Sequence, residues 1–154
     1  MKEVTKEITQ VQKYTVYVAN DGTEFNNPEE CRKYDDSALG VLRAKITKLI
    51  VGKGEAWEVM GGYEDHKVIA IKMHDIHDLD TVKQLFLAEY PYYTKKEHEE
   101  AKNAKFAIMD KAFKDTDCLL FGINCEEEYY FINSVGNIIS NLQALTTILK
   151  TTNN

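Results

Sequence analysis

Histidine and aspartate residues that could bind a metal ion gather between positions 74 and 80, directly after an apolar run. Imidazole nitrogens and carboxylate oxygens are common ligands of zinc, iron and manganese, so His74, His77 and Asp78 form a candidate metal site. The alternative is structural, because Asp78 or Asp80 can cap the start of a helix and interact favourably with its dipole. No second ligand pair at fixed spacing supports the metal site, and we favour the structural interpretation.

A second candidate site is the segment Gly52-Lys53-Gly54, which is followed closely by Trp57. Glycine lets backbone amides approach an anion, lysine supplies charge, and tryptophan offers a stacking surface, which together suit a nucleotide. The segment lacks the Gly-Lys-Ser/Thr ending of a phosphate-binding P-loop and the GxGxxG spacing. The sequence therefore predicts a glycine-rich loop or hairpin, with binding of a nucleotide signal as the alternative.

Tyrosine and glutamate residues that suit contacts with another protein lie next to one another further along the chain. Tyrosine provides a large contact area with a polar tip, and acidic groups attract a basic partner surface. The alternative is that alternate tyrosines are buried in a strand. We predict a partner-binding site at Glu126, Glu127, Glu128, Tyr129 and Tyr130. The acidic region 64–80, which begins with Glu64 and Asp65, forms the second part of this site.

Composition narrows the class of protein. The 154 residues are 44% hydrophobic and 29% charged, with a net charge of −6, which predicts one globular domain over residues 1–154. Acidic residues outnumber basic ones in 55–94 and 117–154, and no lysine or arginine cluster offers phosphate contacts, so we expect no direct nucleic-acid binding. No apolar run is long enough for a membrane span or resembles a signal peptide. Three cysteines, an odd number, favour reduced thiols in a cytoplasmic protein.

Local patterns predict the elements that position these groups. Apolar residues alternate over 14–19, Asp21-Gly22 fits a hairpin turn, and Asn27 followed by Pro28 fits the capped start of a helix that Gly40 could interrupt. Further strands are predicted at 67–73, 118–123 and 129–132. Further helices are predicted to start near Asp78 or Asp80, at Thr94 and after Ser134. The helix after Thr94 turns Ala101, Ala104, Ile108 and Phe113 inward, and the last one repeats Ile138, Ile139, Leu142, Leu145 and Leu149 at helical spacing. The predicted fold class is α+β, a single compact domain in which a small, mainly antiparallel sheet packs against three or four helices.

The segment YTVYVANDGTEFNNPEECRKYDD resembles an element of small bacteriophage and mobile-element proteins. The likeness is carried by Asp21, Gly22, Phe25, Glu30, Cys31 and Tyr34. The segment VIAIKMHDIHDLD is a weaker second likeness. Those proteins mostly have no assigned activity, so the resemblance implies no catalytic role. It implies expression in the cytoplasm of an infected bacterium, where small acidic proteins often bind host machinery.

The leading hypothesis is a non-enzymatic phage or mobile-element protein that acts by protein–protein binding, as an inhibitor of a host bacterial defence system. Its partner would be a host protein or protein complex, without a cofactor, nucleic acid or membrane, and a homo-oligomer is compatible with the sequence. The alternative is a small protein that binds or sequesters a nucleotide signal at the glycine segment. A metal-dependent enzyme is the least favoured hypothesis.

Overall fold

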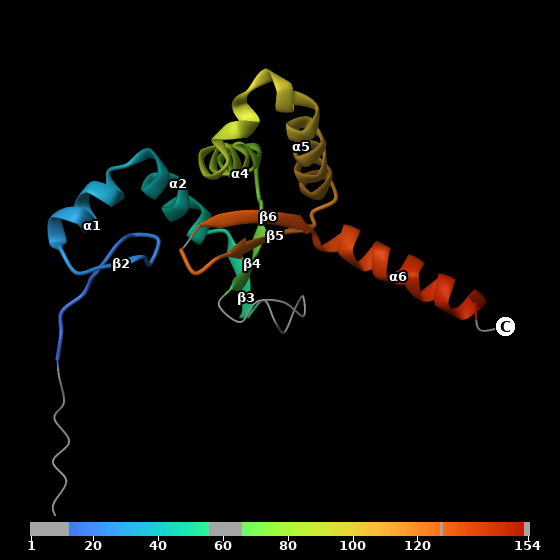
Figure 1. The fold of residues 1–154 in the computed structure, drawn as a ribbon, viewed down its shortest axis with the longest axis horizontal. Coiled ribbons are helices and arrows are strands. Elements are labelled where there is room, and N and C mark those ends of the chain that lie inside the picture. The colour runs from blue at the N-terminus through green and yellow to red at the C-terminus, as the bar shows by residue number, and fades with distance from the viewer. Residues whose placement is uncertain (1–12, 56–65, 127, 153–154) are drawn as a thin grey trace, which may run out of the picture.

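Four antiparallel strands form the central sheet of the protein. The computed structural model describes residues 13–55, 66–126 and 128–152, and Figure 1 shows their arrangement. The strands lie side by side in sequence order, as β3 (Ile50–Glu55), β4 (Lys67–Lys72), β5 (Cys118–Ile123) and β6 (Tyr129–Ser134). This sheet and the helices around it form a mixed α+β fold, which confirms the predicted class.

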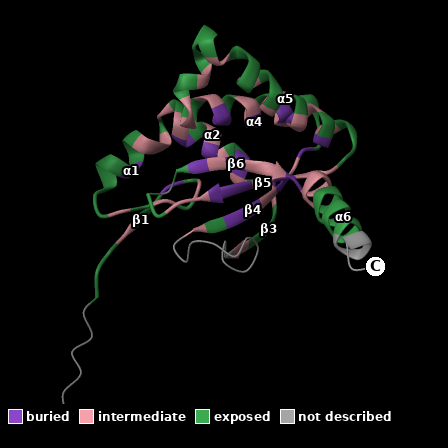
Figure 2. Ribbon diagram, turned by 45° about the vertical axis from the view of Figure 1, so that its right-hand side comes forward, coloured by how far each residue is buried: buried purple, intermediate pink, exposed green. Residues whose placement is uncertain are grey.

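Three helices lie over one face of this sheet, as Figures 1 and 2 show. They are α2 (Ala38–Thr47), α4 (Ile76–Glu89) and α5 (Glu99–Lys114). Alternate residues of the strands, among them Ile69, Ile71 and Phe121, join buried helix residues such as Leu85 and Met109 in one hydrophobic core. The alternating apolar residues of the strands and the helically spaced apolar residues of α4 therefore pack against each other in one layer.

The N-terminal hairpin and first helix follow the local signals in the sequence. Strands β1 (Tyr17–Val18) and β2 (Glu24–Phe25) pair antiparallel around a turn in which Gly22 has a φ angle of 99°, a conformation that glycine adopts without steric cost. Helix α1 (Pro28–Asp35) starts as predicted, because the Asn27 side chain accepts a hydrogen bond of 2.8 Å from the Glu29 amide.

The chain breaks between α1 and α2 at Asp36 and Ser37, before the glycine that was predicted to interrupt it. The Ser37 hydroxyl caps α2 by accepting a hydrogen bond of 3.0 Å from the Gly40 amide. Gly40 lies inside the first turn of α2, where a Cβ atom would overlap the carbonyl oxygen of Tyr34. The glycine is therefore required for the close approach of α1 and α2, and it does not end a helix.

Helix α5 starts later than the sequence predicts. Residues 91–98 form two short 3-10 turns, η1 (Pro91–Thr94) and η2 (Lys96–His98). The Thr94 hydroxyl donates to the carbonyl of Pro91 within η1, so the predicted helix cap at Thr94 is wrong. Tyr90 precedes Pro91 and ends α4, as predicted, because proline disfavours a helical conformation in the residue before it.

The buried face of α5 also differs from the predicted one. Ala101 and Ala104 are exposed, whereas Met109 and Ala112 are buried. Ile108 and Phe113 are half-buried against the core, as their apolar character predicts. Only the second half of α5 therefore supplies buried residues, and its first turns face solvent.

The last helix, α6 (Val135–Thr152), starts where the sequence predicts and then leaves the domain. Its first turn is held by two side chains: the Ser134 hydroxyl accepts from the Asn137 amide at 3.2 Å, and the Asp117 carboxylate accepts from the Gly136 amide at 2.7 Å. Beyond this turn the helix runs away from the sheet, and residues 139–148 are exposed (Figures 1 and 2). Its apolar residues thus do not join the core that holds α2, α4 and α5.

Candidate functional site

The histidine–aspartate segment forms the N-terminal cap of α4. The Asp75 carboxylate accepts hydrogen bonds from the amides of His77 and Asp78, at 2.8 and 3.0 Å, and the Asp78 carboxylate accepts from the His74 amide at 2.8 Å. These reciprocal bonds satisfy amides that the first helical turn leaves unpaired. The sequence predicts Asp78 or Asp80 as the N-cap of this helix. In the structure the N-cap is Asp75, so the predicted cap is wrong. Within the described residues, no three or more histidine, cysteine or acidic side chains are arranged to hold a metal ion.

The glycine segment is a strand, where the sequence predicts a loop. Gly52, Lys53 and Gly54 belong to β3 and pair with β4, with Gly52 opposite Ala70. A Cβ atom at Gly52 would lie 3.7 Å from the Ala70 Cβ, which is an ordinary contact. The predicted loop is therefore wrong for Gly52 to Gly54, whereas the antiparallel pair of β3 and β4 fits the hairpin that the sequence also predicts. Trp57 lies outside the described residues, and nucleotide binding at this segment stays a prediction.

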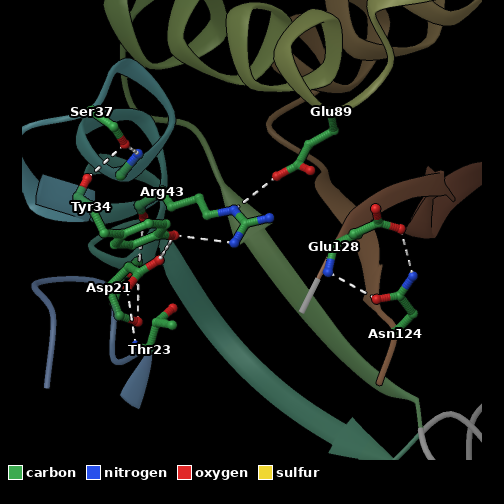
Figure 3. Close-up of polar contacts among 10 residues, drawn as sticks. Asp21, Thr23, Tyr34, Ser37, Arg43, Glu89, Asn124 and Glu128 are labelled. Carbon is green, nitrogen blue, oxygen red and sulfur yellow. Dashed lines mark hydrogen bonds and ion pairs between the residues drawn. The ribbon is translucent and has the colours of Figure 1, made fainter. Parts of the chain in front are cut away.

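The acidic turn between β5 and β6 is organised by one asparagine. The Asn124 side-chain oxygen accepts from the amides of Glu126 and Glu128, at 3.0 and 2.8 Å, and its amide group donates to the Glu128 carboxylate at 2.9 Å (Figure 3). Glu126 and Glu128 are exposed, so their charges face solvent. Three other residues of the predicted partner site lie outside the described residues: Glu64, Asp65 and Glu127.

The two tyrosines of the predicted partner site are packed onto the domain. Tyr129 is only 7% exposed, and the Arg43 guanidinium lies 5.0 Å from the centre of its ring. Burial raises the pKa of Tyr129 to about 12. Tyr130 is half-buried over Gly122, and its hydroxyl lies 3.1 Å from the His66 Nδ1. The alternation of β6 turns the Tyr129 side chain into the core, as the alternative interpretation expects, and partner binding at this site stays a prediction.

A buried polar network joins the N-terminal hairpin to the helices (Figure 3). The Arg43 Nε donates to the Glu89 carboxylate at 2.8 Å, and the exposed fractions of these side chains are 7% and 6%. The Arg43 Nη1 donates to the Tyr34 hydroxyl at 3.1 Å, which in turn donates to the Asp21 carboxylate at 2.6 Å. We name Asp21, Tyr34, Arg43 and Glu89 the Arg43 network.

The electrostatics of the Arg43 network favour a structural role. Burial, followed by the hydrogen bond to Asp21, raises the pKa of Tyr34 to about 12. Burial alone would lower the pKa of Arg43, but the hydrogen bond and the charge of Glu89 outweigh it, and the pKa rises. Among the described residues, every buried side-chain nitrogen and oxygen has a hydrogen-bond partner. The network therefore holds the N-terminal hairpin, α1, α2 and α4 together.

Helix α6 presents a row of exposed apolar side chains. Ile139, Leu142 and Leu145 are 50%, 58% and 51% exposed, and we name these three residues the α6 stripe. The neighbouring Thr146 hydroxyl donates to the Leu142 carbonyl at 2.8 Å, so its hydrogen-bonding capacity is used within the helix. No element in the described part of the chain covers the stripe.

Helix α6 has a low intrinsic stability in the absence of contacts with another element. It is built largely from asparagine, serine, threonine, isoleucine and valine, which are weaker helix formers than alanine, leucine or glutamate. Most of the stability of a helix in a protein comes from tertiary packing of its apolar face. Between Tyr129 and Leu149 the chain has no charged residue, so stabilising ion pairs along α6 are also missing. The physical chemistry of α6 therefore favours burial of the stripe against a partner.

Reasoning from the sequence missed this surface, although a signal was present. Helical spacing predicts a helix of the compact domain that contains Ile138, Ile139, Leu142, Leu145 and Leu149. A helix on a domain surface normally has charged residues opposite its apolar face, and α6 has none before Lys150.

Among the described residues, no helix combines the length and apolarity needed to cross a bilayer.

The fold and its surface together define a small α+β protein that carries an exposed apolar helix. No protein-family model, curated protein or solved structure matches the chain. Its function must therefore be inferred from its own residues.

Proposed function

We propose that this protein acts by binding another protein chain through the α6 stripe, without catalysing a reaction. The observation that carries this proposal is the half-exposed state of Ile139, Leu142 and Leu145 on a helix of low intrinsic stability. Complete burial of one such side chain contributes about 1.5–3 kcal/mol. Three adjacent side chains on one helix face can therefore supply a large part of a binding free energy.

A protein partner fits α6 better than a membrane surface does. Helices that lie on a bilayer usually carry lysine and arginine on the polar face, where these residues meet anionic lipids. Residues 135–149 contain no charged side chain of either sign. The helix thus offers apolar contact without the electrostatic attraction that holds amphipathic helices on lipid.

The acidic turn is a proposed second contact. Glu126 and Glu128 are exposed and lie on a turn whose backbone Asn124 holds in place, so their charges have a defined position. Charge reversal with Glu126→Lys and Glu128→Lys is expected to weaken binding of a basic partner and to reduce its salt dependence. Retained binding with an unchanged salt dependence would reject this contact.

We further propose, from the resemblance of the N-terminal segment, that the partner of the acidic turn is a host protein of a bacterium that carries the phage or mobile element. Inhibition of a defence system is the specific form of this proposal. A plaque assay on a defended host, with and without the chain, is the appropriate measurement. No rescue of a sensitive phage in any defended strain would count against the inhibitory role.

Site-specific photo-crosslinking in living cells tests binding through α6. A photoreactive amino acid at Thr146 lies beside the stripe, whereas one at Ser140 lies on the opposite side of the same helix. We expect protein crosslinks from position 146 and few from position 140. Equal yields from both positions, or none from either, would overturn the proposal that α6 is the contact surface.

A further inference from the structure

The apolar residues of α6 follow the spacing of a coiled-coil seam. Counted along the chain, the intervals alternate between three and four residues over the set Val135, Ile138, Leu142, Leu145 and Leu149. This is the a and d pattern of two heptads, in which each side chain packs between residues of a facing helix. The spacing therefore suits a helix of the same kind as a partner.

The positions beside this seam carry no charge. In the same heptad numbering, the e and g positions are Ile139, Asn141, Thr146 and Ile148. Coiled coils that select a different partner chain commonly use opposite charges at these positions, and like charges there oppose pairing of identical helices. The uncharged e and g positions therefore lack the charge pattern that would select a different helix. They also lack the like charges that would oppose pairing with the same helix of another copy.

We propose that the α6 stripe binds the same helix of a second copy of this chain, so that the protein is a homo-oligomer built on α6. This inference rests on the proposed function, since it names the partner of that surface. An isologous contact between two copies places the same apolar patch on both sides of a two-fold axis. The two-fold contact buries Leu142 and Leu145 of each copy at once.

The size of the surface predicts a weak association. With 18 residues, α6 is about 27 Å long, and a face about 10 Å wide is much smaller than the roughly 800 Å² per partner of a standard interface. The net charge of −6 on each copy adds mutual repulsion. We therefore expect association only at high protein concentration.

The test is analytical ultracentrifugation of the full chain over a wide concentration range, together with light scattering. The wild-type chain is expected to shift from the monomer mass of 17.7 kDa to at least twice that mass as its concentration rises. The variant Leu142→Ala with Leu145→Ala removes four side chains from the two-fold contact and is expected to weaken association at least about 100-fold. Alanine raises helix propensity, so a loss of association in this variant cannot be assigned to a melted helix.

A matched control changes the opposite face of the same helix. Ser140→Ala makes a truncation away from the stripe and is expected to associate like the wild type. Raising the NaCl concentration from about 0.05 to 0.5 M is expected to preserve or strengthen association, because it screens repulsion between acidic copies. Association that fails at high salt would overturn the apolar seam as its cause.

Two outcomes separate this inference from the proposed function. A wild-type chain that remains monomeric at millimolar concentration, while Thr146 still crosslinks another protein in cells, overturns self-association and leaves protein binding intact. A monomer that instead sediments with phosphatidylcholine–phosphatidylglycerol vesicles, in a manner that requires Leu142 and Leu145, overturns both.

Discussion

The Arg43 network buries charged residues, whereas the α6 stripe exposes apolar ones. Charged residues are usually exposed and apolar ones buried. In the network, an arginine and a glutamate are almost fully buried, but each is paired and hydrogen-bonded. In α6, isoleucine and leucine are half-exposed without a covering element in the described part of the chain. A buried charge requires partners within the fold, whereas an exposed apolar row can be satisfied by another molecule. The comparison separates residues that hold the domain together from residues that face outward.

The matched hydrogen bonds of the network give it a structural role. Its donors and acceptors are matched to one another across the hairpin turn, α1, α2 and α4. The cation also lies over the ring of Tyr129, which links the same group to β6. Asp21 and Tyr34, which belong to the segment that resembles phage proteins, thus take part in the Arg43 network that holds the domain together. A substitution in the Arg43 network is expected to lower the stability of the fold. A substitution in the α6 stripe is expected to weaken association.

The largest expected effect follows from removing the buried cation. Arg43→Met leaves the Glu89 carboxylate buried without its ion-pair partner, which should lower the free energy of unfolding by about 3–5 kcal/mol. Urea denaturation followed by circular dichroism measures this change. In the double variant Arg43→Met with Glu89→Gln, the loss should be smaller than the sum of the single losses. A loss below about 1 kcal/mol in Arg43→Met would show that the network does not lock the fold.

A second effect concerns the close approach of the two helices next to the network. Gly40→Ala places a methyl group against the Tyr34 carbonyl, and we expect a loss of about 1–3 kcal/mol in the free energy of unfolding. Gly52→Ala is the matched control, because its new methyl group lies 3.7 Å from the Ala70 side chain at ordinary contact distance. Equal unfolding midpoints for the two variants would contradict the packing seen between α1 and α2.

The third prediction is a loss of stability at high pH. The folded chain holds the phenol protons of Tyr34 and Tyr129 with pKa values of about 12, above the ordinary value of 10.0. Their contribution to stability is therefore fully present below about pH 10 and is lost as the pH rises through 12. Unfolding curves between pH 8 and 12 measure this dependence. Tyr129→Phe removes one of the two groups and should flatten the alkaline decline; an unchanged decline would exclude Tyr129 as a contributor.

The smallest expected effect is on the α6 stripe in dilute solution. Leu142→Ala should change the free energy of unfolding by less than about 0.5 kcal/mol in the monomer, because the side chain is 58% exposed. Leu85→Ala, a truncation of the same residue type in the core, should cost about 2–5 kcal/mol. Thermal unfolding at a low protein concentration provides the comparison. A large loss for Leu142→Ala in the monomer would mean that α6 packs on its own domain.

Short-range signals explain most of what could be predicted. The Asp21-Gly22 turn, the cap at Asn27 and the helix start after Ser134 each depend on a few adjacent residues, and each is present in the structure. Failures occurred where two local solutions compete. At Thr94 a 3-10 turn uses the hydroxyl that a helix cap would need, and at Gly52–Gly54 glycine fits an edge strand as readily as a loop.

The sequence by itself determined the α+β class, the strands β4, β5 and β6, and the apolar periodicity that builds the core. Only the tertiary structure decided which apolar residues are covered and which polar ones are buried. Tyr129 and Leu142 show the reason: both lie in apolar patterns of the correct period, but periodicity defines a face without naming what packs on it. Contacts between distant segments place Tyr129 under Arg43 and leave Leu142 in solvent.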